Sequence, residues 1–145
     1  QAPLKFKRPL HFVVSAVRAL APTGDVMSTA NTSVAEIGQE LFEWETPDGY
    51  PDTLEYWGGN LLGRWKAANR LVSEGSALQA VDVTAYQQGT PEASVDRMNR
   101  ELFSGELAPE TRTALLSYAS AGTFDETRVR ETLALALSAP AFQRY

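Results

Sequence analysis

Apolar residues recur along most of this chain at intervals of three and four positions, the spacing of one face of an α-helix. The first such segment runs from Pro9 to Leu20 and carries apolar side chains at Leu10, Val13, Val14, Val17 and Leu20. Similar segments begin near Ser33, Leu61, Pro91, Pro109 and Thr123, and no segment has a convincing strand pattern. The chain is therefore predicted to be all-α, an irregular bundle of about five or six helices forming a single domain over residues 1–145.

Several helix starts are marked by residues that suit the unpaired N–H groups of a first turn. Pro9 fits the first helical position, where its missing N–H costs little, and Thr90 precedes another such proline. Asn60 is a typical N-cap residue. It predicts a helix from Leu61 to Glu74, with Gly75 as the residue that ends it.

Capping-box spacing, in which two residues three apart satisfy each other's backbone N–H groups, occurs at Ser33 and Glu36. It predicts that the second helix begins at Ser33, after a loop over residues 27–32, and ends near Phe42 or Glu43. The same spacing predicts a helix start at Thr123 and Glu126.

The helix predicted after Asn60 is expected to bury one apolar face, formed by Leu61, Leu62, Trp65, Ala68 and Val72. Arg64, Lys66 and Arg70 are then expected to face outward or toward the acidic loop that precedes this helix. Trp57 and Trp65 are predicted to anchor the core. Residues 76–88 fit either a short helix or irregular packing.

The stretch from Gly38 to Trp65 contains all three tryptophans, several other aromatic residues and six acidic residues, with no lysine or arginine before Arg64. Its prolines and glycines predict a long loop between the second and third helices. Asp52 is expected to cap a short turn that follows this loop.

Composition removes several classes of function. A net charge of -5 argues against a nucleic-acid partner, because such proteins usually present a basic face. The absence of cysteine excludes disulfides, thiol nucleophiles and zinc-thiolate sites. No apolar run approaches the roughly 20 residues that a membrane-spanning helix needs. The small basic cluster of Lys5, Lys7 and Arg8 is expected to be solvated.

Catalytic and metal-binding signals are weak. His11 is the only histidine and lies within an expected helix, where a structural role is the common one. The chain has no G-x-S-x-G turn to present a nucleophilic serine. The acidic loop lacks the residue pattern of an EF-hand, so no metal site and no cofactor are expected.

The acidic aromatic loop is the best candidate site, and three kinds of function are open for it. Carboxylate pairs can hydrolyse glycosidic bonds, aromatic faces can stack on sugars, and exposed aromatic residues among carboxylates can bind a protein. The candidate binding residues are Trp44, Tyr50, Glu43, Glu45, Asp48 and Asp52.

Several motifs resemble one large bacterial family, named only as domain of unknown function eighteen-hundred. They are Gly38-Gln39-Glu40-Leu41-Phe42, Thr46-Pro47-Asp48-Gly49-Tyr50-Pro51, Trp57 and Leu61-Leu62-Gly63-Arg64-Trp65. Two flanking segments agree, Lys7-Arg8-Pro9-Leu10 running into Ser15 to Leu20, and Leu135 to Gln143, where Ala141 replaces a frequent glutamate. The resemblance spans nearly the whole chain but covers about the last third of a typical member.

The resemblance implies an exported bacterial protein of the periplasm, cell envelope or extracellular space, and the C-terminal portion of a longer protein. It implies no established reaction and no catalytic residue. Its implied partners are proteins: the N-terminal portion of the family, a sulfatase-like neighbour or another copy of the chain. We expect a non-catalytic interaction or structural domain, with a carboxylate-based hydrolase or a glycan-binding module as the alternative.

Overall fold

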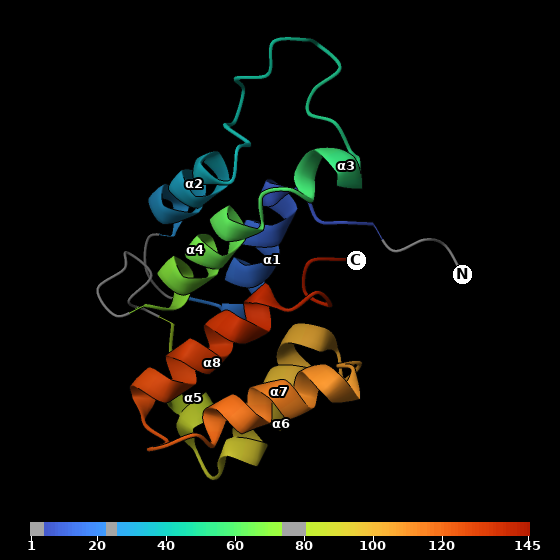
Figure 1. Cartoon of the computed structure of the whole chain (residues 1–145). Coiled ribbons are helices and arrows are strands. Elements are labelled where there is room, and N and C mark those ends of the chain that lie inside the picture. The colour runs from blue at the N-terminus through green and yellow to red at the C-terminus, as the bar shows by residue number, and fades with distance from the viewer. Residues whose placement is uncertain (1–4, 23–25, 74–80) are drawn as a thin grey trace.

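The computed structural model describes residues 5–22, 26–73 and 81–145, and eight helices lie in these ranges (Figure 1). They are α1 (Pro9–Leu20), α2 (Met27–Glu36), α3 (Leu54–Trp57), α4 (Leu61–Val72), α5 (Thr84–Gln87), α6 (Pro91–Phe103), α7 (Pro109–Ala119) and α8 (Glu126–Ser138). No sheet forms among the described residues, and Phe6 and Arg144 form an isolated antiparallel bridge. The predicted all-α class is confirmed; α3 and α5 are short helices of 4 residues each.

Four helix starts lie where the sequence predicts them. Pro9 and Pro109 are the first residues of α1 and α7. Asn60 and Thr90 cap α4 and α6 with their side chains. Asn60 Oδ1 accepts the Gly63 N–H at 3.2 Å, and Thr90 Oγ1 accepts the Ala93 N–H at 3.3 Å. The predicted helix end at Glu74 and Gly75 lies outside the described residues.

The second helix differs from the prediction at both ends. Residues 27–32 are helical rather than a loop, and Ser33 is buried inside α2 instead of capping it. The chain leaves the helix at Gly38, whose φ of +95° is readily adopted only by glycine. Gln39 then turns inward, and its Oε1 accepts the Leu10 N–H of α1 at 2.8 Å. A tertiary hydrogen bond to an unpaired first-turn N–H therefore replaces the expected extension of the helix.

The predicted capping box at Thr123 is also wrong. Asp125 is the N-cap of α8, and its Oδ1 accepts the Arg128 N–H at 2.9 Å. Because Glu126 is then the first helical residue, it cannot occupy the third position that a capping box requires.

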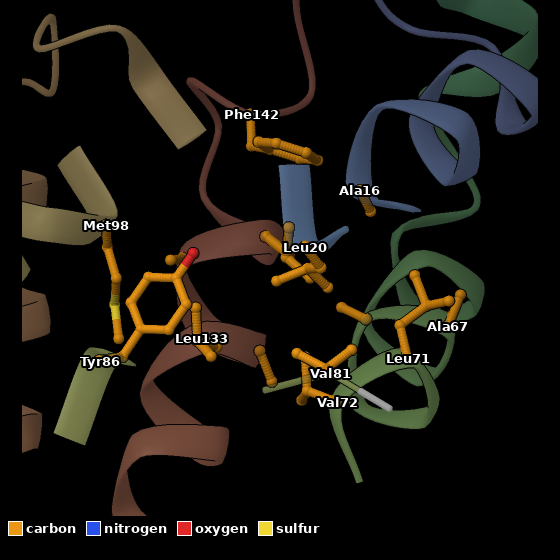
Figure 2. Close-up of a cluster of buried hydrophobic side chains, with 14 of the residues drawn as sticks. Ala16, Leu20, Ala67, Leu71, Val72, Val81, Tyr86, Met98, Leu133 and Phe142 are labelled. Atoms are coloured by element: carbon orange, nitrogen blue, oxygen red, sulfur yellow. The ribbon is translucent and has the colours of Figure 1, made fainter. Parts of the chain in front are cut away.

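The core lies where α4 and α8 pack together, with α1, α6 and α5 around them. Figure 2 shows the buried side chains that meet there, including Ala67 and Leu71 of α4 and Leu133 of α8. Met98 of α6 and Tyr86 of α5 extend this cluster.

The buried face of α4 is rotated from the predicted one. Arg64 has no exposed surface, whereas Trp65 is 48% exposed and Leu61 and Leu62 also face solvent. The prediction that Trp65 anchors the core is therefore wrong, but Trp57 is buried as predicted. Ala67 and Ala68 let neighbouring helices approach this face closely. Arg64 lies one turn earlier on the same buried face.

Arg64 joins the two ends of the described chain. Its Nη1 donates to Gln143 Oε1 at 3.0 Å, and its Nη2 donates to the Lys7 carbonyl at 2.6 Å. Lys7 N–H in turn donates to the Gln143 carbonyl at 2.7 Å. The guanidinium also lies 4.4 Å from the centroid of the Phe6 ring and 5.5 Å from that of Phe12. Burial lowers the pKa of Arg64 to about 10.

Candidate binding site

The segment between α2 and α3 rises away from the other helices (Figure 1). Three hydrogen bonds fix its path. Asn60 Nδ2 donates to the Ile37 carbonyl, Trp57 Nε1 to the Pro51 carbonyl, and the Tyr50 hydroxyl to the Glu40 carbonyl, each at 2.7 Å. Side chains thus satisfy backbone groups that have no helix or sheet partner, which holds the loop in one conformation.

Four aromatic rings continue from the core into this loop. The ring centroids of Trp44 and Tyr50 lie 4.6 Å apart with an interplanar angle of 41°, and those of Trp44 and Tyr56 lie 5.9 Å apart at 87°. Trp57 contacts both tyrosines, at 5.7 Å and 4.6 Å. The buried Trp57 therefore anchors a cluster whose outer members are the other three rings.

A cavity of about 360 Å³ opens beside these rings, and we call it the acidic aromatic cavity. Its walls contain the carboxylate residues Glu40, Glu43 and Glu45 and the aromatic residues Trp44, Tyr50 and Tyr56; Ala35, Gly38 and Thr46 complete them. None of these lining residues is a lysine or arginine. The cavity therefore has a negative rim over aromatic faces.

The structure gathers four of the six predicted binding residues, because Trp44, Tyr50, Glu43 and Glu45 all line the cavity. Asp48 and Asp52 are outside its lining. Asp48 instead accepts a hydrogen bond from the Thr46 hydroxyl within its own turn.

Asp52 ties the loop to the segment before α1. Its carboxylate lies 3.1 Å from Lys5 Nζ and 3.8 Å from Arg8 Nε. The hydrogen bond from Lys5 lowers the pKa of Asp52. The predicted capping role is wrong, since Thr53 is the N-cap residue of α3 and makes no side-chain cap bond.

Two cavity residues, Glu40 and Tyr56, were absent from the predicted set. Glu40 was assigned to a helix that actually ends four residues earlier, and Tyr56 to a turn. Glu40 and Tyr56 have the same acidic and aromatic character as the residues in the predicted set, so residue type could not separate them from other residues of the stretch. Their place in the cavity follows from the path of the backbone.

The environment of the rings is unusual in two respects. Partial burial raises the pKa of the Tyr50 hydroxyl, and that hydroxyl donates to Glu40. The Trp44 indole N–H is enclosed and has no acceptor among the described residues. Burying a donor without a partner lowers the free energy of unfolding by about 1–3 kcal/mol. Trp44 is therefore held by its ring contacts with Tyr50 and Tyr56 and not by a hydrogen bond.

Other chemistry is not assembled in the described part of the chain. No three histidine, aspartate or glutamate side chains there are placed to hold a metal ion. None of the described helices is both long and apolar enough to span a membrane. His11 contacts the Tyr145 hydroxyl through Nδ1 at 3.2 Å, and burial lowers its pKa.

Comparison with known proteins identifies a family and no individual relative. No curated protein and no solved structure matches the chain. One family profile, described as Protein of unknown function (DUF1800), matches residues 1–144. Because this match covers nearly the whole sequence, the chain belongs to the DUF1800 family of proteins of unknown function.

Proposed function

We propose that this chain is a non-catalytic interaction domain whose acidic aromatic cavity binds a cationic side chain of a protein partner. One observation carries the proposal: three carboxylate residues and three aromatic residues line one cavity that has no basic residue in its walls. Aromatic faces attract cations through their ring quadrupoles, and the attraction grows when the cation is desolvated. Carboxylates at the rim add charge complementarity.

The surface beside the cavity also suits a protein partner. Phe42 is 100% exposed, and its φ of +68° is uncommon for a residue other than glycine. It is the chain neighbour of the cavity residue Glu43 and does not line the cavity itself, so it is available to a partner that extends beyond the cavity. An aromatic residue covered in this way can supply much of the binding free energy of an interface.

The ring geometry favours a cation over a sugar. A sugar platform needs at least two roughly coplanar aromatic faces. Trp44 instead makes angles of 41° and 87° with its two tyrosine neighbours, so the three rings present no flat surface to a sugar. A cation needs only one exposed aromatic face with negative charge nearby.

The same arrangement gives less support to a hydrolase. That reaction needs one carboxylic acid that stays protonated beside a carboxylate that stays ionised. Two of the predicted carboxylate residues, Asp48 and Asp52, lie outside the cavity, and Asp52 is paired with Lys5. We therefore assign the cavity to recognition rather than to acid–base chemistry.

The proposal is tested by titrating the protein with a short arginine- and lysine-containing peptide while the tryptophan indole N–H signals are followed by NMR. Trp44→Ala and the double variant Glu43→Gln with Glu45→Gln are expected to weaken binding at least about tenfold, since each removes cation contacts. The matched control is Trp65→Ala, which removes an exposed tryptophan on α4 outside the cavity.

Two outcomes would contradict this function. Equal binding by wild type and the glutamine double variant would show that the carboxylates do not recognise the peptide. Binding of neutral oligosaccharides that Trp44→Ala abolishes and the glutamine substitutions leave intact would assign the cavity to a glycan instead.

A further inference from the structure

A second cavity, of about 480 Å³, lies between the end of α6 and the last residues of the chain. It shares no lining residue with the acidic aromatic cavity. Its walls include Lys7, Leu102, Phe103, Glu106, Phe142 and Arg144. The walls therefore hold two cationic residues and one carboxylate residue beside apolar and aromatic side chains. This excess of positive charge is the opposite of the negative charge that lines the first cavity.

Lys7 is the unusual member of this cavity. It is only 8% exposed, and its Nζ lies 4.0 Å from the centroid of the Phe142 ring. The ammonium group of Lys7 lies over the face of Phe142. Among the described residues it forms no ion pair with a carboxylate. Burial lowers the pKa of Lys7 to about 8, so the amine remains mostly charged at neutral pH. A buried lysine without a counter-ion is uncommon, because desolvating an ammonium group is costly.

The Lys7 backbone is held rigidly. Its N–H donates to the Gln143 carbonyl at 2.7 Å, and its carbonyl accepts from Arg64 at 2.6 Å. The flanking residue Lys5 exchanges two backbone hydrogen bonds of 3.0 Å with Tyr145. The backbone is thus fixed before any ligand arrives, which reduces the entropy lost on binding.

We propose that this Lys7 cavity binds a small organic anion, a carboxylate with a compact apolar body. The carboxylate pairs with the Lys7 ammonium and the Arg144 guanidinium, and the apolar body lies against Phe103 and Phe142. The anion supplies the counter-ion that the buried amine lacks, and the apolar wall distinguishes such a ligand from inorganic phosphate. This site is independent of the function proposed for the acidic aromatic cavity.

The test uses three probes with the full chain: benzoate, its neutral analogue benzyl alcohol, and inorganic phosphate. Saturable binding of benzoate is expected at millimolar concentration, with much weaker binding of the other two. Lys7→Met is expected to weaken benzoate binding at least about tenfold, and Arg144→Gln several-fold. Lys66→Met, which removes an exposed lysine of α4 outside the cavity, is the matched control and should bind as wild type does.

A measurement on the wild-type protein avoids dependence on how the variants fold. The side-chain NMR signals of Lys7 and Phe142 should shift as benzoate is added, while those of Lys66 stay fixed. The proposal is overturned if benzoate does not saturate, or if Lys7→Met binds it as tightly as wild type. Phosphate binding as tight as benzoate binding would refute the apolar part of the site.

Discussion

Replacing the buried Arg64 by methionine gives the sharpest test of what joins the two ends of this fold. The guanidinium donates to Gln143 Oε1 and to the Lys7 carbonyl and lies against the rings of Phe6 and Phe12. Methionine is an unbranched apolar side chain that can fill much of the buried space, but it leaves both acceptor oxygens without a donor.

The expected magnitude follows from opposing contributions. Each hydrogen bond from a charged donor contributes about 1.5–3 kcal/mol, which gives a gross loss of roughly 3–6 kcal/mol for two. Removing a desolvated cation that has no carboxylate partner recovers part of this loss. We therefore expect Arg64→Met to lower the free energy of unfolding by about 2–4 kcal/mol.

Urea unfolding followed by far-ultraviolet circular dichroism measures this change. Arg70→Met is the control, because its partly exposed guanidinium pairs with Glu36 on the surface and such pairs contribute less than about 1 kcal/mol. Arg64→Lys keeps the charge but cannot place two donors in a fixed fork, so it should recover only part of the loss.

Amide hydrogen exchange adds a local measurement. The N–H groups of Lys7 and Tyr145 should exchange faster in Arg64→Met, because the bonds they make join the two chain segments that Arg64 holds. The reasoning is refuted if Arg64→Met is no less stable than Arg70→Met, or if Arg64→Lys matches wild type. A more stable methionine variant would show that desolvation of the cation outweighs its hydrogen bonds.

Three further predictions concern single side chains. Because the pKa of Lys7 is lowered to about 8 from 10.5, the unfolded chain binds more protons between these values, so stability should rise with pH across this window. Lys7→Met should remove that rise, a difference of at most about 3 kcal/mol by thermal unfolding at each pH; parallel pH profiles would contradict it. Asn60→Ala should cost about 1–2 kcal/mol, since it removes the α4 cap and the bond to the Ile37 carbonyl; urea midpoints measure this, and an unchanged midpoint would count against it. Asp52→Asn should lower the urea midpoint slightly at low salt and leave it unchanged at high salt, because the ion pair of Asp52 with Lys5 is exposed and screened; a salt-independent loss would contradict the assignment.

The sequence determined most of the helices by itself. Local signals act within a few residues of the chain, so Pro9, Asn60, Thr90 and Pro109 marked their helix starts correctly. The apolar stripe of α8, with Val129, Leu133 and Leu137 buried, was also readable because a strong period needs no tertiary information.

Tertiary structure decided where local signals competed. Ser33 and Glu36 have capping-box spacing, yet burial against α1 extends the helix back to Met27. The polar stretch at the start of α2 has weak helix propensity, and packing outweighs propensity of this size.

The largest difference is the rotation of α4, which buries Arg64 and exposes Trp65. Hydrophobicity alone ranks these two residues in the opposite order. Their placement depends on Gln143, which lies 79 positions from Arg64 in sequence and offers it a hydrogen-bond acceptor. The acidic aromatic cavity likewise depends on the backbone turn at Gly38, which brings Glu40 beside Tyr50. The sequence by itself therefore determined the residue types of the site and most helices, whereas distant partners that satisfy buried polar groups decided which faces turn inward.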